Sequence, residues 1–238
     1  MAGVFYCIFA GETIIIQTDR TMTSLTLSSF KQLIDSTPEL IILDTREPTE
    51  FADGFITESM LICLDDQFND WLANLIPSDK PMLLIIEPGM EQTASEYLSK
   101  SGQGPILGYL QGGFNTWKNE GEMFDMVITI EADEFAMDLP FDEKIVVVDV
   151  RSEDEYESGH VVDAINLPLT SMADPGSLAL LEENENLYIY CSNGDHGIMA
   201  AAIMKKQGFH NLRTIVDGWN AIRQEKKIKT ELSKEKLN

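Results

Sequence analysis

Short runs of apolar residues alternate along the chain with longer amphipathic segments. Two runs, Ile41 to Leu43 and Ile145 to Val148, are continuously apolar and rich in β-branched residues, which is typical of parallel strands buried on both faces. Further strands are predicted at 61–64, 82–86, 106–109, 165–167, 187–190 and 213–216, and helices at 92–100, 114–119, 198–207 and 219–227. The alternation predicts an α/β fold in which helices cover both faces of a mainly parallel sheet.

Helix-terminus signals support these elements. Ser152 and Glu155 have the spacing of a capping box, and Pro48 fits the first position of a helix. Lys205 and Lys206 precede Gly208, which is typical of a helix that ends in a left-handed glycine cap.

The pattern of strands, helices and motif residues occurs twice in the chain. Residues 43–64 align without gaps with residues 148–169, so that Asp44, Arg46, Glu50 and Gly54 correspond to Asp149, Arg151, Glu155 and Gly159. The same offset of 105 positions (149 − 44 = 105) relates LQGGFNTW to IVDGWNAI near the end of each copy. A constant offset at both ends of a long span indicates two copies of one domain.

The repeat divides the chain into three parts. We expect an N-terminal β-hairpin at residues 1–20, a first domain at 21–125 and a second domain at 126–238. Each domain is a mainly parallel sheet with helices on both faces. The charged residues 228–238 are expected to form a frayed tail.

Composition excludes several classes of function. The net charge of −23 disfavours a nucleic-acid partner and repels small anions. No run approaches the roughly 18 apolar residues of a membrane helix, and the N-terminus lacks the basic flank of a secretory signal. The three cysteines lack C-x-x-C spacing, which disfavours a disulfide framework and a structural zinc site. We therefore expect a cytoplasmic protein with no metal, no cofactor and no membrane association.

Cys191 stands where chemistry is expected in such a fold. It follows the apolar run 187–190 and opens a short polar loop that leads into a helix, whereas the equivalent strand of the first copy ends in Glu87. Ligands of parallel α/β sheets meet the carboxyl ends of the strands, and a loop entering a helix directs backbone N–H groups at an anion. The same field is expected to lower the thiol pKa, and Gly194 and Gly197 to let the loop curl.

Both copies resemble the rhodanese family of sulfurtransferases. Residues 126–227 are similar to that family in the motif D-V-R-x-x-x-E-Y-x-x-G-H-V-x-x-A-I-N-L-P-L, the cysteine loop and the closing Val216-Asp217-Gly218-Trp219. Residues 22–120 resemble a degraded copy. The tandem also resembles the two-rhodanese tail that follows a metallo-β-lactamase-like domain in some sulfur-metabolism proteins, although this chain has no His-x-His-x-Asp-His cluster.

The resemblance implies a reaction and its residues. Cys191 would be the nucleophile and persulfide carrier, which takes sulfane sulfur from thiosulfate or a persulfide and passes it to a thiol or cyanide. The loop residues would bind the transferred sulfur: Ser192, Asn193, Gly194, Asp195, His196 and Gly197. The family loop runs Cys-x-x-Gly-x-Arg, and here His196 replaces the arginine beside the acidic Asp195. Both changes reduce anion affinity, so thiosulfate turnover is expected to be weak.

Other interpretations stay open. Related phosphatases and arsenate reductases use a longer Cys-x5-Arg loop, and both the extra residue and the arginine are missing here. A non-catalytic binding or regulatory module would explain Glu87, Asp195 and His196 as well as an enzyme would. The first domain, which cannot carry sulfur on Glu87, is expected to be structural or a surface for a protein partner.

Simple structural roles are expected for the remaining candidates. Packing is predicted for Cys7, Cys63, Trp117 and Trp219, a structural ion pair for Asp149–Arg151 and its copy Asp44–Arg46, a structural role for His160, and a solvated position for His210.

Overall fold

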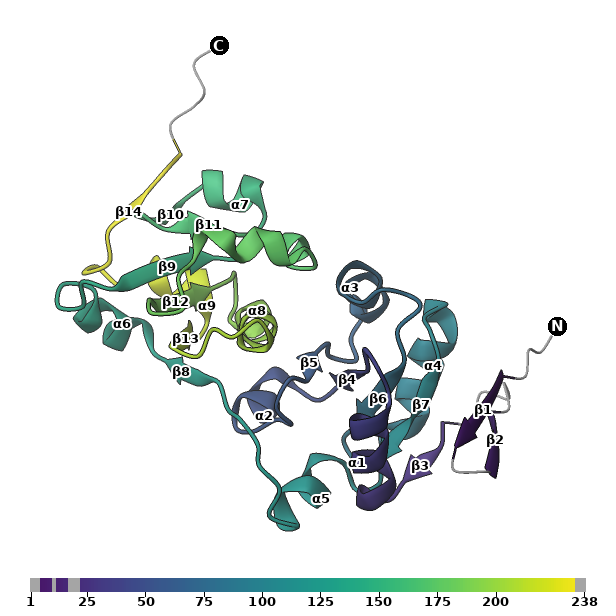
Figure 1. The fold of residues 1–238 in the computed structure, drawn as a ribbon. Coiled ribbons are helices and arrows are strands. Elements are labelled where there is room, and N and C mark those ends of the chain that lie inside the picture. Colours follow the sequence, from purple (N-terminus) through teal and green to yellow (C-terminus); the bar gives the residue numbers. More distant parts are fainter. Residues whose placement is uncertain (1–4, 10–11, 17–21, 234–238) are drawn as a thin grey trace.

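The computed structural model describes residues 5–9, 12–16 and 22–233. Most of them belong to two α/β units, each built on a five-stranded parallel sheet (Figure 1). In sheet order, the first has β3 (Ser24–Leu25), β7 (Ile106–Leu110), β6 (Met82–Ile85), β4 (Ile41–Asp44) and β5 (Met60–Leu61). The second has β8 (Ile128–Ile130), β13 (Leu212–Ile215), β12 (Asn186–Tyr190), β9 (Ile145–Asp149) and β11 (Ile165–Asn166). The two orders are the same, which confirms two copies of one α/β domain.

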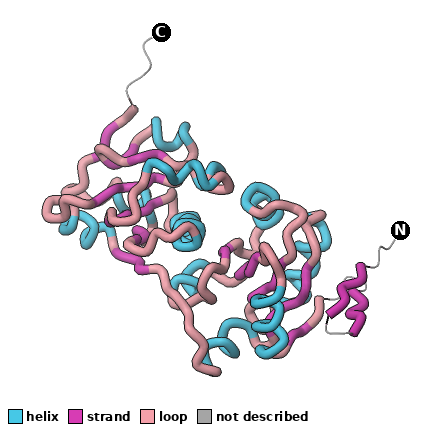
Figure 2. Tube along the Cα trace, in the orientation of Figure 1, coloured by secondary structure: helices cyan, strands magenta, loops and turns pink. Residues whose placement is uncertain are grey.

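Helices connect these strands in both units (Figure 2). The first unit contains α1 (Leu27–Ser36), α2 (Pro48–Ala52), α3 (Phe68–Leu75), α4 (Glu91–Ser101) and α5 (Gly113–Asn119). The second contains α6 (Ala132–Asp138), α7 (Glu153–Glu157), α8 (Asp195–Lys206), α9 (Gly218–Ile222) and the 3-10 turns η1 (Leu169–Ser171) and η2 (Pro175–Leu180). Pro48 opens α2, the Ser152–Glu155 capping box opens α7, and Gly208 follows α8 with φ +98°, as the sequence predicted.

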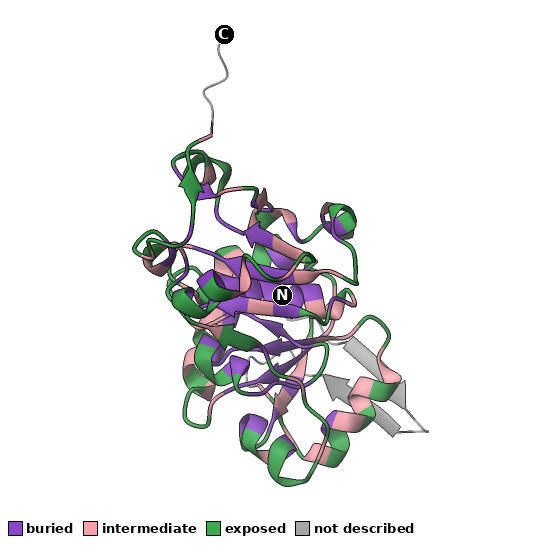
Figure 3. Cartoon of the chain, turned by 90° about the vertical axis from the view of Figure 1, so that its left-hand side faces the viewer, coloured by how far each residue is buried: buried purple, intermediate pink, exposed green. Residues whose placement is uncertain are grey.

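Alternate strand residues point to opposite faces of each sheet. In the first sheet Ile42 and Leu83 pack with Phe30 of α1, while Leu43 and Leu84 face the opposite cluster. The strands are therefore buried on both faces, and they form the central buried layer in Figure 3. Continuously apolar runs predicted this arrangement.

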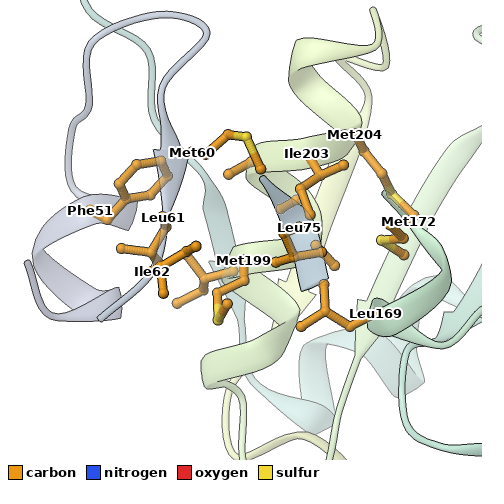
Figure 4. Close-up of a cluster of buried hydrophobic side chains, with 14 of the residues drawn as sticks. Phe51, Met60, Leu61, Ile62, Leu75, Leu169, Met172, Met199, Ile203 and Met204 are labelled. Carbon is orange, nitrogen blue, oxygen red and sulfur yellow. The ribbon is translucent and has the colours of Figure 1, made fainter. Parts of the chain in front are cut away.

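One hydrophobic core joins the two units. The first unit contributes Phe51 of α2, the β5 segment and Leu75 of α3, and the second contributes Leu169, Met172 and helix α8. Figure 4 shows these side chains converging from both units around Met199 and Ile203. Helix α8 is the centre of this contact, because it packs on β12 and β13 of its own sheet and on α2 and β5 of the other unit. The domains are thus held together by apolar burial rather than by a flexible tether.

Each unit also contains the expected buried ion pair. Arg151 donates two hydrogen bonds from Nε and Nη2 to the carboxylate of Asp149 and a third, of 2.7 Å, to the carbonyl of Gly159. Arg46 repeats this arrangement with Asp44 and the carbonyl of Gly54. All four side chains are at most 5% exposed. The pair ties the end of β4 or β9 to the turn after α2 or α7, which is a structural role.

Four predicted elements differ in the structure. The helix expected at 198–207 is α8, which begins three residues earlier, at Asp195. The strand expected at 61–64 is Met60–Leu61, because its partner β4 ends at Asp44. The helix expected at 219–227 ends at Ile222, and the chain then turns to bury Ile228, which is 6% exposed. The frayed tail expected at 228–238 is wrong for its described part, since β14 (Thr230–Glu231) pairs with β10 (His160–Val161). Residues 234–238 lie outside the described residues.

The N-terminal hairpin was expected within residues 1–20. Strands β1 (Phe5–Phe9) and β2 (Glu12–Ile16) pair antiparallel there. None of the helices in the described ranges is long and apolar enough to cross a membrane.

Removing the Asp149 carboxylate would leave the Arg151 guanidinium buried without its counter-charge. We expect Asp149→Ala to lower the free energy of unfolding by about 3–5 kcal/mol, measured by urea denaturation. Lys31→Ala, which removes a half-exposed ion pair with Glu122, is the control and should change it by less than about 1 kcal/mol. An Asp149→Ala protein as stable as the control would contradict the assigned role.

Candidate active site

Cys191 lies between the carboxyl end of β12 and the amino end of α8. Its loop is only four residues long, and Gly194 turns the chain into the helix with φ +103°. A side chain at φ > 0 is strained, so this position requires glycine. Gly197 differs from the expectation, because it lies inside the first turn of α8 with no unusual backbone angle.

The loop folds its backbone around the sulfur of Cys191. The amide of Gly194 donates to Sγ at 3.1 Å, and the amides of Asn193, His196 and Gly197 also point at it. The side chain is nevertheless 1% exposed, and burial raises the pKa of the Cys191 thiol more than these N–H groups lower it. The expectation that the helix and loop would lower the thiol pKa is therefore wrong, since desolvation of the thiolate is the larger effect.

Backbone hydrogen bonds from the start of α9 hold this loop in place. The amide of Trp219 donates to the carbonyl of Cys191 at 2.7 Å, and that of Asn220 donates to the carbonyl of Ser192 at 3.2 Å. Gly218 has φ +48°, and a Cβ there would overlap the carbonyl oxygen of Cys191. The glycine that the repeat preserves is thus required by a close backbone contact.

Glu155 connects α7 to the cysteine loop. One carboxylate oxygen accepts from the hydroxyl of Ser192 at 2.7 Å, and the other accepts from the hydroxyl and amide of Ser152. Partial burial acts to raise the pKa of Glu155, but these hydrogen bonds outweigh it and the pKa is lowered. The carboxylate therefore stays charged at neutral pH and holds the outer side of the loop.

Asn193 and Asp195 form the exposed rim of the loop. The side-chain oxygen of Asn193 lies 3.7 Å from the Cys191 sulfur, where it accepts the S–H, and its amide nitrogen donates to Asp195 at 2.8 Å. Asp195 is the first residue of α8, where a negative charge is favoured by the helix N-terminus.

His196 is covered by the first domain. Its ring lies 4.9 Å from the ring of Trp71, centroid to centroid, in an edge-on arrangement. Burial lowers the pKa of His196, although the carboxylates of Asp195, Asp65 and Glu155 oppose this shift. The imidazole is therefore neutral at pH 7 and supplies no cation in place of the family arginine.

The corresponding place in the first domain keeps the scaffold without the thiol. Ile86 directly follows β6 as Cys191 directly follows β12, and its carbonyl meets a Cβ on Gly113 as that of Cys191 meets one on Gly218. The expectation that Glu87 stands at the cysteine position is therefore wrong by one residue, because Asp44 pairs with Ile85 as Asp149 pairs with Tyr190. Burial and then the neighbouring Glu50 raise the pKa of Glu87. This copy can present a carboxyl group at the loop but no nucleophilic sulfur.

Of the seven predicted residues, Cys191 to Gly194 form the loop and Asp195 to Gly197 open α8. Sequence reasoning missed Glu155 and Trp71 as parts of this site. Glu155 was visible as a repeated position and a capping residue, but its second contact to Ser192 spans 37 positions. Trp71 comes from the other domain, so no local signal in the sequence could have assigned it.

The remaining candidates from the sequence are two cysteines and two histidines. Cys63, just after β5, is a half-buried free thiol whose pKa is raised by burial and then by nearby carboxylates. The ring of His160 stacks on Tyr156 and hydrogen-bonds its carbonyl, while His210 is exposed, as expected. The side chain of Cys7 lies outside the described residues. In the described part of the chain, no three His, Cys, Asp or Glu side chains are arranged to hold a metal ion.

Comparison with known proteins identifies related domains. The model of the rhodanese-like domain matches residues 26–120 and 132–225. The putative sulfur carrier protein YrkF of Bacillus subtilis is 32% identical over 143 residues, which are 59% of this chain and 74% of that protein. A sulfurtransferase of Allochromatium vinosum is 28% identical over 97 residues, 40% of this chain and 89% of its own.

Among solved structures, a thiosulfate sulfurtransferase from Pseudomonas aeruginosa superposes with a TM-score of 0.40 and 17% identity. That match covers 90% of this chain and 44% of the other.

The raised thiol pKa has a direct kinetic consequence, because only the thiolate reacts with iodoacetamide. In the resting protein we expect alkylation of Cys191 to rise with pH through a midpoint above that of a free cysteine, roughly 8.5. The modified peptide is quantified by mass spectrometry, with the urea-unfolded protein as control. A folded-state midpoint below that of the unfolded protein would contradict the dominance of burial.

Proposed function

Because this chain belongs to the rhodanese-like domain family and carries two such domains in tandem, we propose that it is a sulfurtransferase that carries sulfane sulfur on Cys191. The observation that supports this most directly is the ring of four backbone amides around the Cys191 sulfur. These donors suit a sulfur anion at the base of the loop. The relatives named as a sulfur carrier and a sulfurtransferase support the same class of chemistry.

The reaction divides into two displacements at sulfur. The Cys191 thiolate attacks the outer sulfur of thiosulfate, the S–S bond breaks, and sulfite leaves with the electron pair, so that a Cys191 persulfide anion remains. A thiolate acceptor, or cyanide, then attacks the outer sulfur of that persulfide. The second S–S bond breaks and the Cys191 thiolate is restored. A persulfide donor reacts in the same way and releases a thiolate in place of sulfite.

Loop residues have separate roles in this proposal. The amides of Asn193, Gly194, His196 and Gly197 bind the anionic sulfur. The side chains of Ser192 and Asp195 hold the loop through Glu155 and Asn193. Since the resting thiol is protonated at neutral pH, loading is the slow step, and a reducing compartment such as the cytoplasm keeps the thiol available.

The proposed organisation keeps the boundaries expected from the repeat. Residues 126–238 carry the reaction, residues 21–125 are an inactive copy, and residues 1–20 precede it as a hairpin extension. The inactive copy stabilises the catalytic one through the shared apolar core. It also offers a surface to a protein partner.

A non-catalytic binding module is the second candidate. It is favoured by the buried thiol with its raised pKa and by the neutral His196 in place of an arginine. It predicts that Cys191 stays a thiol under all sulfur donors. The two candidates therefore differ in one measurable modification.

Persulfide formation tests the leading proposal. After incubation with thiosulfate, or with a low-molecular-weight persulfide, the intact mass should rise by one sulfur atom, about 32 Da, because the outer sulfur stays on Cys191. Cys191→Ser, which keeps size and polarity, should show no gain. If the wild-type mass is unchanged with every donor tried, the chain is the binding module.

Restoring a loop cation should favour the dianionic donor. We expect His196→Arg to raise the rate of sulfur transfer from thiosulfate several-fold at pH 7, since a permanent charge replaces a neutral imidazole. His196→Gln, which stays neutral, is the matched control and should give no gain. Rates from an uncharged donor should change less, and a thiosulfate rate equal to that of the control would contradict this account.

A further inference from the structure

Trp71 brings the first domain to the first turn of α8. Leu75, one helical turn after Trp71 in α3, lies in the shared core beside side chains of α8 (Figure 4). Residues four positions apart lie on the same side of a helix, and α3 also packs beside η1 of the second domain. The Trp71 ring meets the ring of His196 edge-on, with 4.9 Å between the centroids. An aromatic contact between the domains is therefore made at this turn.

His196 takes part both in this contact and in the surroundings of the sulfur. Its imidazole lies against Trp71, and its backbone amide is one of those that point at the sulfur of Cys191. The residue belongs to the first turn of α8, whose following residues, from Gly197 to Met204, are all buried. A change in the surroundings of this ring is therefore made at a residue whose backbone faces the sulfur.

Acidic groups from three elements act on the charge of the His196 ring. Asp195 precedes it in α8, Glu155 lies on α7, and Asp65 precedes α3 in the first domain. These carboxylates favour a protonated imidazole, but burial opposes them and lowers the pKa of His196. Because the carboxylates are present in any case, the amount of water at the ring decides its charge.

We infer that Trp71 is a positioning residue for the Cys191 site, because its indole ring excludes water from His196 and so keeps the imidazole uncharged. The contact between the domains thereby restrains the thiol. When α3 moves away from the second domain, His196 takes up a proton from solvent, and its charge stabilises the Cys191 thiolate. The inactive copy thus regulates the reactive one. The inference rests on the proposed function for its effect on sulfur transfer, but its physical basis can be measured without a sulfur donor.

The protonation of His196 is the first measurement. The imidazole resonances of the three histidines are followed by NMR over roughly pH 5 to 9, and that of His196 is assigned by its loss in His196→Gln. We expect Trp71→Ala to raise the protonated fraction of His196 at pH 7 several-fold, because the ring gains water while the carboxylates remain. Trp71→Phe, which keeps an aromatic ring at this position, should stay near the wild type.

Leu75→Ala is the matched control. It removes core packing from the same helix but leaves the Trp71 ring in the chain. It should lower the free energy of unfolding and leave the protonated fraction of His196 near that of the wild type. Circular dichroism checks that each variant is folded. If Trp71→Ala is not, Trp71→Leu, a milder truncation, replaces it with the same expected direction.

The second measurement asks whether the effect reaches the sulfur. Alkylation of Cys191 by iodoacetamide is read on its own peptide by mass spectrometry, as the ratio of the Trp71→Ala rate to the wild-type rate. A unit positive charge roughly 5–10 Å from a thiol raises its thiolate population about two- to fourfold in water. The imidazolium exists only at the lower pH, so the ratio should be about two- to fourfold larger near pH 6 than near pH 9. A change in access alone would raise it equally at both.

A background that lacks the imidazole tests the route. When both proteins carry His196→Gln, the same ratio should no longer depend on pH, since the amide takes up no proton. A pH-dependent ratio that persists there would overturn the route through His196. A Cys191 that iodoacetamide modifies in neither protein would overturn the effect on the thiol.

The first measurement can overturn the inference by itself. An unchanged protonated fraction in Trp71→Ala would do so, and a smaller one would show instead that the indole stabilises the imidazolium by cation–π attraction. An equal rise in Leu75→Ala would overturn the assignment to Trp71, because looser packing alone would explain it.

Loading with thiosulfate separates this inference from the proposed function. The Cys191 persulfide should form faster in Trp71→Ala than in the wild type at pH 7. Absence of any persulfide in both proteins would refute the proposed function, whereas the histidine resonance and the alkylation ratio would still decide the role of Trp71.

Discussion

Helix α8 is buried on both sides, and the rest of the structure depends on this burial. One side packs on β12 and β13, and the other on α2 and β5 of the first domain. Eight of its residues in sequence, Gly197 to Met204, are buried. A helix without a solvated face has one allowed position, so the loop that opens it is fixed together with the contact between the domains. The packing of α8 therefore determines both the orientation of the first domain and the geometry around Cys191.

The two copies have kept their scaffold and diverged in their chemistry. Both retain the buried Asp–Arg pair and the glycine that allows a helix start to touch the loop carbonyl. These features maintain a backbone shape, which is needed whether or not the loop reacts. The first copy lacks the thiol, while its α3 supplies Trp71, whose ring packs against His196 of the other copy. The first domain thus contacts the first turn of the helix that follows the cysteine loop of the second.

Electrostatics and burial oppose each other at the sulfur. Backbone amides and the helix N-terminus favour a negative charge there, but desolvation disfavours one more strongly. Because the neutral His196 adds no positive charge, the protonated thiol is favoured over the thiolate. A site of this kind suits slow, selective sulfur handling better than rapid capture of a dianion, which agrees with the protein's overall charge of −23.

The sequence by itself determined the α/β class, the duplication, the ion pairs and the cysteine loop, because each depends on local periodicity or on a repeated motif. It also indicated Glu155 and Gly218 as repeated positions, although not what they contact. Only the tertiary structure decided that Trp71 packs against His196, that Thr230 and Glu231 pair with β10, and that burial raises the pKa of the Cys191 thiol. These outcomes depend on how two separately encoded surfaces pack and on how much water that packing removes. Short-range patterns do not record either quantity, since packing and desolvation are summed over residues distant in the chain.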